Sequence, residues 1–550
     1  MFSLLDEAWL PVRRSSGLAR IRPCEVTDNI KDDPVLSLAW GRADFDAASR
    51  EFMIGLLASS CPPADSDSWR DWWREPPAPS TLAKIFEPYA RAFMLDGDGP
   101  RFMQDQALLE GEALPISQLL IEAPGGNTEL LNKDLFKKRG GAPFLSRAAA
   151  AMALYTLQSY APSGGQGHRT SMRGGGPLTT LVLPAETLPQ PPSLWHQLWL
   201  NVVAPDEDEP LPAPCDSSVF PWLGPTRTSE GNRATTPDDV HPAQVYWGMP
   251  RRIRIDFTEN ETRESCPLGG TCDPVVAVSF RAKNFGTKYE SFEHPLTSYY
   301  KPKKDAAEWL PTHPQPGGIG YRHWVALAKS EGETTRPAKA VRWARDRLID
   351  LADDPASGRR ARLLAHGFDM DNMKARGFVE SEMPLHLLSR SQGLFDDLCR
   401  QLVSAAGEVA GLLVGSLRIA LFSERSIVKT DRELFASLRE RFYLETERDF
   451  FDLIGDVAAG LSSGSEFERL SVQATKRWLE RLRPVAIRLF EEAAPLDADA
   501  TKDMPRLIDA RRSLHLALHG YGKRGATVFQ ALHLPVPDSK PASKRRKKAA

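Results

Sequence analysis

A glycine-rich stretch, residues 161–177 with the sequence APSGGQGHRTSMRGGGP, is the first segment whose composition could support binding chemistry. It lacks the Gly-x-x-x-x-Gly-Lys-Ser/Thr order of a P-loop and the GxGxxG spacing of a dinucleotide site. What remains is a loop with few bulky side chains, flanked by Arg169 and Arg173 and leading into a strand. Such a loop lets backbone N–H groups approach phosphates or a groove wall closely. A flexible surface loop is the alternative interpretation.

A second segment, residues 281–289 (RAKNFGTKY), combines cations with aromatic side chains. It contains Arg281, Lys283 and Lys288 at the junction of a predicted strand and a loop. This pattern is typical of contacts to a nucleic-acid backbone or groove. A solvated charged face is the alternative, because charge is the only argument.

Residues 366–375 (HGFDMDNMKA) place acidic side chains close together. Counted from Asp369, acidic residues occupy the first, third and twelfth positions of a calcium loop. However, Met373 stands at the fifth position, where an oxygen ligand is expected, and Lys374 at the sixth, where glycine makes the turn. We therefore reject calcium binding and predict a polar turn before the helical region.

Catalytic and metal-binding patterns are weak elsewhere. Cys266 and Cys272 have no second cysteine pair to complete a zinc site. His515 and His519 form an HxxxH pair without the glutamate of a zinc protease. Residues 460–464 match GxSxG, but a predicted helix precedes them where a nucleophile elbow needs a strand. We expect no enzyme activity, no metal and no cofactor.

The predicted elements that position these segments divide the chain into two parts, which differ in composition and in apolar periodicity. Up to about residue 380, proline and glycine recur and helical periods are brief, which predicts a large, irregular α+β domain, residues 1–382. Residues 178–183 and 275–280 predict buried strands, and the Ala- and Leu-rich residues 143–158 predict a helix. Low-hydrophobicity loops are expected at residues 205–214 and 226–237.

The C-terminal part predicts an all-α domain, residues 383–535. Apolar residues at spacings of three and four predict four amphipathic helices, separated by short breaks, and so a four-helix bundle. Residues 536–550 are basic and of low complexity, and we expect a disordered tail. The four helical segments are Leu385–Ser423, Asp431–Ala459, Ser465–Ala493 and Thr501–Arg524.

Composition limits the class of protein. The 550 residues carry a net charge of −2, whereas a stand-alone DNA-binding protein is usually strongly basic. A nucleic-acid role must then depend on local patches or on partners that carry most of the charge. The six scattered cysteines, the absence of a signal-like N-terminus and the absence of a long apolar run predict a cytoplasmic protein with no membrane span.

Several runs, taken in order, resemble the CasA family, the large subunits of the type I-E CRISPR surveillance complex (Cascade). Each run is modest, but together they span nearly the whole chain. They are the opening residues 4–13 (LLDEAWLPVR), residues 101–104 (RFMQ), the glycine-rich stretch, residues 245–253 (VYWGMPRRI) and His294-Pro295.

The resemblance implies a non-catalytic role beside other Cascade subunits and a guide CRISPR RNA. It implies recognition of the short PAM motif in double-stranded target DNA, help in opening the duplex for R-loop formation, and reception of the Cas helicase–nuclease. The family's minor-groove lysine matches Lys283. Its glycine loop matches Gly164, Gly165, Gln166 and Gly167; its wedge matches Asn372 and Met373 after Asp371; and its guide-end loop matches Asn132, Lys137, Lys138 and Arg139.

Three departures bear on these matches. Gln166 replaces a glycine, Asn-Met replaces the Gln-Ala of the wedge, and Asp371 replaces asparagine. An anionic residue near DNA would be repelled by phosphate or would accept from a cytosine amino group, so the PAM preference is expected to differ. The positions of a cysteine pair found in some members are Ser146 and Ala149, which argues against zinc. The alternatives are a scaffold that contacts only guide RNA and protein, and a stand-alone nucleic-acid enzyme.

Overall fold

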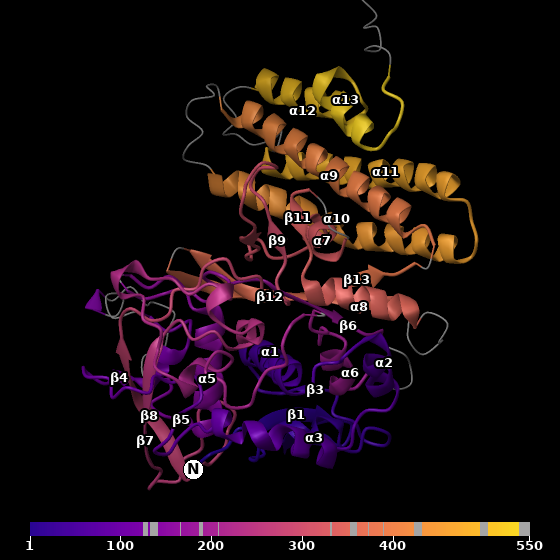
Figure 1. Ribbon diagram of the computed structural model, residues 1–550. Helices are drawn as coiled ribbons and strands as arrows, with labels where there is room; N and C mark the ends of the chain where they lie inside the picture. The colour runs from indigo at the N-terminus through magenta and orange to yellow at the C-terminus, as the bar shows by residue number, and fades with distance from the viewer. Residues whose placement is uncertain are drawn as a thin grey trace, which may run out of the picture. The chain divides into compact units, whose positions relative to one another are not determined.

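The computed structural model describes residues 1–124, 130–131, 141–165, 167–185, 191–206, 208–329, 333–351, 360–371, 373–388, 390–422, 432–494 and 504–537. The chain forms two compact units (Figure 1): the first contains Met1–Gly318 and Ser330–Leu385, and the second contains Ile319–Lys329 and His386–Ala550. The first unit mixes strands and helices, and the second is helical. The expected α+β fold class, with a mixed N-terminal part followed by a helical C-terminal part, is confirmed.

The first unit contains a long antiparallel strand pair. β7 (Arg252–Glu259) pairs with β8 (Val275–Lys283), and Figure 1 shows the two side by side. The strand predicted at residues 275–280 is confirmed, and it continues to Lys283, which lies opposite Arg252. Two short strands, β4 (Leu114–Pro115) and β5 (Leu145–Ser146), also pair with β8. The lysine singled out in the sequence thus ends a well-supported strand.

Aromatic side chains fill the core of the first unit around Phe52 on α1 (Ala43–Ser60). Each edge-to-face aromatic pair adds roughly 0.5–1.5 kcal/mol beyond the burial of its area. α5 (Arg147–Tyr160), the helix predicted at residues 143–158, packs against α1. The glycine-rich stretch therefore begins at the end of a helix that is fixed in the core. The rings with centroids 5.5–5.9 Å from that of Phe52 belong to Trp9, Phe93, Phe102, Tyr155 and Trp247.

A long hairpin stands where the sequence predicted only a turn. β12 (Arg360–Asp371) and β13 (Lys374–His386) pair with each other, and β12 also pairs with β6 (Thr179–Leu183), the other predicted strand. The predicted polar turn is the tip of this hairpin. The strands escaped prediction because β13 is largely exposed and rich in charged residues, so its inward-facing side chains give no clear alternation. The first predicted helix therefore begins later, since Leu385 still belongs to β13.

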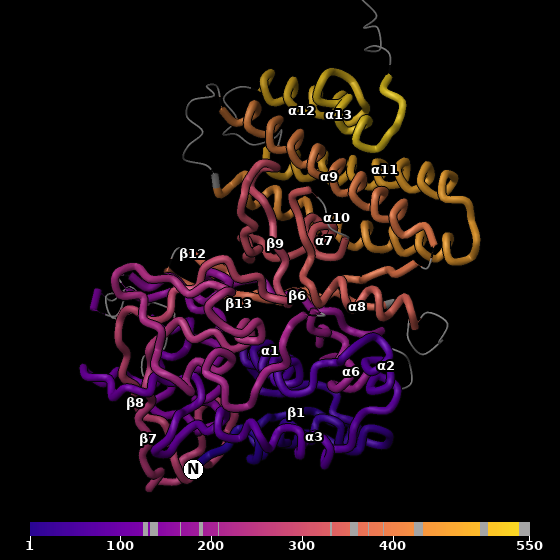
Figure 2. The backbone as a smooth tube through the Cα atoms, viewed as in Figure 1, coloured from indigo at the N-terminus to yellow at the C-terminus, as the bar shows by residue number. Residues whose placement is uncertain are grey.

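The second unit is built around α9 (Gln392–Leu421), which packs against α10 (Arg432–Ser462), α11 (Phe467–Ala493) and α12 (Met504–Leu518) (Figure 2). By length and composition α9 could cross a membrane, but much of its apolar face is buried among these helices. The fourth predicted segment is two helices rather than one. Gly520 adopts a positive φ of 89°, and α13 (Gly522–Ala531) follows.

α7 (Tyr321–Ala328), expected in the mixed part, joins the helical unit, where Tyr321 stacks on Phe450 of α10. The remaining elements belong to the first unit. They are β1 (Leu10–Arg14), β2 (Gly17–Ile21), β3 (Ser37–Leu38), α2 (Ser66–Arg74), α3 (Pro79–Phe86), α6 (Leu194–Trp199), β9 (Tyr299–Tyr300), β10 (Leu310–Pro311), β11 (Thr335–Arg336) and α8 (Lys339–Asp350).

Candidate nucleic-acid interface

Two glycines of the loop predicted to approach DNA adopt backbone conformations that favour glycine. Gly165 has φ +87° and Gly167 has φ +79°. A Cβ atom on Gly165 would meet nothing within 4 Å, so this residue is open on its outer side. A Cβ atom on Gly167 would lie 2.7 Å from Cβ of Asn284. Gly165 is therefore available for close approach, whereas Gly167 is required by its neighbour.

The glycine loop lies directly against the cationic segment that follows β8. The backbone N–H of Phe285 donates to the carbonyl oxygen of Gly167 at 2.8 Å. Gly286 permits the turn that brings Phe285 there, because a Cβ at that position would overlap the carbonyl of Pro250. The structure thus brings together two segments that the sequence analysis singled out separately.

Of the three cations in this segment, Lys283 alone has no partner among the described residues. Arg281 lies 3.6 Å from Asp256 and donates to the carbonyl of Gly111, and Lys288 forms a 2.6 Å ion pair with Glu290. The Lys283 side chain is exposed and forms no hydrogen bond or ion pair within the part of the chain that the structure describes. Its charge is therefore available to a ligand.

The hairpin tip contacts the other end of the glycine-rich stretch. A Cβ on Gly176 would lie 2.6 Å from both Cγ of Met370 and the carbonyl oxygen of Phe368. Asp371 is exposed and ends β12, and the Met373 side chain at the tip is 55% exposed. Hydrophobic packing of Phe368 on Tyr160, the last residue of α5, anchors β12 close to the tip of the hairpin. The glycine-rich stretch therefore contacts the β8 loop near one end and the hairpin at the other.

A buried polar network fixes these segments to one another. Glu51 on α1 accepts hydrogen bonds from Arg173 at 2.7 Å and from Thr179 on β6 at 2.6 Å. Tyr160 also donates to Glu51, and the Tyr160 oxygen lies 3.2 Å from Nδ1 of His366 on β12. All five side chains are almost fully buried. Glu51 thus joins the core helix α1, the glycine-rich stretch and β6, and Tyr160 extends the network to β12 of the hairpin.

The electrostatics of this network support a structural role. Burial raises the pKa of Glu51, but the Arg173 guanidinium and the hydrogen bonds from Thr179 and Tyr160 together outweigh burial, so the net shift is downward and the ion pair persists at neutral pH. Burial lowers the pKa of His366 to about 3, against the attraction of Glu51, so this imidazole is neutral. Arg173, which the sequence placed beside the loop as a cation for phosphates, is therefore committed to Glu51.

Six of the predicted contact residues lie outside the described residues. They are Asn132, Lys137, Lys138 and Arg139 of the guide-end loop, Gln166 of the glycine loop and Asn372 of the wedge.

Metal ligands do not gather in the part of the chain that the structure describes: no group of three or more His, Cys, Asp or Glu side chains lies within reach of one ion. Cys266 is buried, whereas Cys272 is exposed and its thiol donates to the carbonyl of Arg263. His515 and His519 stack with ring centroids 4.4 Å apart on α12. These pairs therefore give no metal centre.

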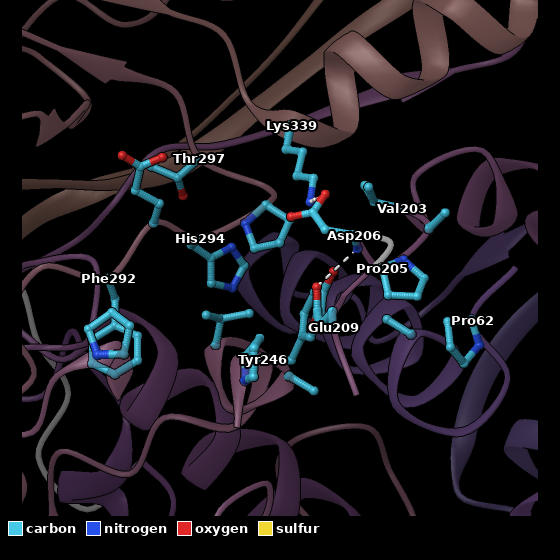
Figure 3. A pocket seen from close by; sticks show the side chains of 18 of the residues that line it. Pro62, Val203, Pro205, Asp206, Glu209, Tyr246, Phe292, His294, Thr297 and Lys339 are labelled. Carbon is cyan, nitrogen blue, oxygen red and sulfur yellow. Dashed lines mark hydrogen bonds and ion pairs between the residues drawn. The ribbon is translucent and has the colours of Figure 1, made fainter. Parts of the chain in front are cut away.

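A cavity of about 550 Å³ opens elsewhere on the first unit (Figure 3). It is lined by several prolines, by Asp206 and Glu209 from the acidic loop predicted at residues 205–214, and by the cations Arg336, Lys339 and Arg342. Asp206 pairs with Lys339 at 3.0 Å. Acidic and basic side chains line this cavity in equal number, so it offers no excess of positive charge to phosphate and is a poor candidate for a nucleic-acid site.

Sequence reasoning missed two features of the interface. It did not pair Glu51 with Arg173, and it treated Arg251 only as part of an aromatic-rich run. Arg251 donates to the carbonyl oxygen of Pro162 at 2.5 Å, at the start of the glycine-rich stretch. No local pattern distinguishes these two arginines, since each partner is more than 80 residues away in the sequence.

Comparison with known structures shows the same fold in several proteins. CasA of Thermus thermophilus has a TM-score of 0.68 at 18% identity, covering 93% of this chain and 98% of that protein. Cse1 of Thermobifida fusca has a TM-score of 0.67 at 18% identity, covering 97% and 98%. A chain of a CRISPR RNA-guided surveillance complex has a TM-score of 0.64 at 15% identity, covering 94% and 99%.

Comparison with protein families gives the assignment. Residues 3–489 match the family described as CRISPR-associated protein Cse1, which is also called CasA. The match covers most of both units, and it confirms the resemblance found in the sequence. The chain belongs to the Cse1 family of CRISPR-associated proteins.

Proposed function

We propose that this chain is the large, non-catalytic subunit of a type I-E Cascade complex that recognises the PAM in double-stranded target DNA. In this role it helps to open the duplex for guide RNA pairing and receives the helicase–nuclease. Family membership and the likeness to a chain of an RNA-guided surveillance complex support the assembly. The observation that carries the DNA role is the contact of one glycine-rich stretch with both the Lys283 loop and the hairpin.

The chemistry of the loop suits tolerant reading of a short motif. The minor groove distinguishes mainly A·T from G·C pairs, so a lysine and close backbone contacts give degenerate recognition. Lys283 supplies an uncommitted charge, and Gly165 supplies a surface without a side chain. Degenerate reading is sufficient for a motif that is checked before guide pairing supplies the sequence specificity.

The hairpin suits the opening step. Inserting a side chain at a base step costs a few kcal/mol of unstacking, so the inserting element must be held firmly. The Asp369–Arg376 ion pair, at 2.7 Å, braces the two strands just below the tip, and the buried network holds β12 from behind. The near-neutral net charge fits this division of labour, because the rest of the complex would hold the duplex while the tip acts.

The complex assembled with and without this chain tests the proposal. Binding to a duplex that carries the PAM is compared with binding to a duplex that lacks it, and to a single-stranded target. We expect removal of the chain to abolish the preference for the PAM duplex while leaving single-strand binding nearly intact. Equal PAM preference with and without the chain would show that the chain is a scaffold. A pull-down of the helicase–nuclease with both assemblies tests its recruitment in the same way.

A further inference from the structure

Arg251 is held rigidly beneath the glycine loop. It lies immediately before β7, and its backbone is fixed by Gln158 of α5. The N–H of Arg251 donates to Oε1 of Gln158 at 2.9 Å, and Nε2 of Gln158 donates to the Arg251 carbonyl at 2.9 Å. Gln158 is 1% exposed, so this clamp belongs to the core. The starting direction of the Arg251 side chain is therefore fixed by the fold.

The guanidinium lies against the position where Gly164 has no side chain. A Cβ on Gly164 would lie 2.9 Å and 3.1 Å from the two terminal nitrogens of Arg251. One of these nitrogens, Nη2, donates to the carbonyl of Pro162 at 2.5 Å. The absence of a side chain at Gly164 leaves room for the guanidinium at the glycine loop.

This charge has no counter-ion among the residues that the structure describes. Within the described residues, no carboxylate forms an ion pair with Arg251, and its Nε is buried without a hydrogen-bond partner. Burial lowers the pKa of Arg251 to about 10, so the side chain is still charged at neutral pH. A poorly solvated charge without a partner is costly, and an anion at this place would remove the cost. Arg173, by contrast, has Glu51 as its partner.

The loop offers further donors beside this guanidinium. The N–H groups of Gly164, Gly165 and Gly167 donate to no group in the described part of the chain. Unsatisfied backbone N–H groups in a glycine loop favour an anion. Burial and the nearby Arg251 lower the pKa of His168 below the ordinary value, so Arg251 rather than His168 supplies positive charge beside the loop.

We propose that Arg251 and the N–H groups of Gly164, Gly165 and Gly167 bind a backbone phosphate of the target DNA duplex. This site would be separate from the minor-groove contact of Lys283 and would set the depth to which the loop enters. The inference rests on the proposed function, since it assigns a phosphate ligand to the same loop. An arginine suits the task, because its planar donors match phosphate oxygens in pairs.

Titration of the assembled complex with PAM and non-PAM duplexes over a series of salt concentrations tests the site. Arg251→Met should weaken binding about tenfold on both duplexes, as expected for one lost charged hydrogen-bonding contact. It should also reduce the slope of log affinity against log salt by about one. Arg251→Lys should retain the slope but recover only part of the affinity. Arg101→Met is the matched control, because Arg101 also bonds to backbone carbonyls, those of Gly97 and Ile255, away from the loop.

Parent affinity and parent slope in the Arg251→Met complex would overturn the phosphate site. So would equal losses in the methionine and lysine variants with the slope unchanged, which would indicate a structural effect. If the methionine variant does not fold, a loss of salt slope in the lysine variant contradicts the site. Failure of the proposed function is distinct, because the parent complex itself would then show no PAM preference.

Discussion

The cations of the helical unit and those around the glycine-rich stretch differ in what they pair with. On α10 and α11, several arginines form ion pairs with carboxylates of the next turn or the neighbouring helix, whereas Arg439 and Arg469 form none with the described residues. Around the glycine-rich stretch, Lys283 and Arg251 have no carboxylate partner among the described residues. The helical pairs are Arg441–Glu445, Arg441–Glu492, Arg488–Glu445, Arg488–Glu492 and Arg477–Asp456.

For the proposed interface, the difference teaches that a cation near the glycine-rich stretch can serve a ligand only where no carboxylate already pairs with it. A paired arginine presents little net field to DNA, whereas an unpaired one still attracts phosphate. Arg173 is the example of a cation that is near the loop but already paired. It lies in the glycine-rich stretch, yet it is 3% exposed and forms an ion pair with Glu51. It positions the loop, and we expect it to contribute nothing directly to binding.

The largest expected effect is on folding stability. It compares the loss of a buried ion pair with the loss of an exposed ion pair. Glu51→Gln leaves the Arg173 charge buried without a partner, which should cost about 3–5 kcal/mol of unfolding free energy. Glu492→Gln, at an exposed pair of the helical unit, should cost far less, because water screens exposed ion pairs. Urea unfolding measures both, each from the transition of its own unit. Similar small losses in the two variants would show that the buried network does not hold the first unit together.

The next effect is the loss of folding stability at acidic pH through His366. The pKa of His366 is about 3 in the folded chain, below its ordinary value of 6.5, so the unfolded chain binds one more proton between these values. Stability should therefore fall as the pH falls from about 6.5 towards 3, by about 1.4 kcal/mol per pH unit from this group.

The variant His366→Asn, which retains an N–H near the position of Nδ1, should remove this contribution. Unfolding free energies of parent and variant, measured between pH 4 and pH 7, should converge as the pH is lowered. Other histidines titrate in both proteins and cancel in the comparison. Parallel pH profiles would mean that His366 is not buried as a neutral group.

The smallest expected effect is on DNA binding. It is measured by comparing two lysines of residues 281–289, of which one is unpaired and the other is paired. Lys283→Ala should weaken binding of the complex to a PAM duplex about tenfold and change single-strand binding much less, because a single strand has no minor groove. Lys288→Ala, whose lysine already pairs with Glu290, should change neither. Affinities on both substrates check this. Equal losses from Lys283→Ala on both substrates would favour a generic backbone contact.

Local sequence patterns predicted a good part of this structure. The apolar runs at residues 178–183 and 275–280 are strands β6 and β8, and the alanine-rich run is α5. These elements are short or strongly patterned, so their character is encoded nearby. The β12–β13 hairpin was missed, because its strands are stabilised by pairing with β6 and by packing on α5 rather than by their own composition.

The assembly of the site could not be predicted in the same way. Gly167 meets Phe285 and Arg173 meets Glu51 across more than 100 residues of sequence. A single sequence shows that Arg173 and Arg251 are cationic. It does not show which of the two pairs with a carboxylate in the core. The turn at Gly520 was also hidden, because both helices continue the same apolar spacing across it.

We propose that the glycine loop and the hairpin read the PAM and then open the duplex. Measuring the opening step tests this proposal most directly. A fluorescent base analogue beside the PAM reports opening by the assembled complex, while the association rate is followed separately. Replacing Asn372 and Met373 with glycine should leave association unchanged and slow opening, and a target already melted at that base pair should restore the parent rate. Slow opening that the melted target does not restore would contradict the account.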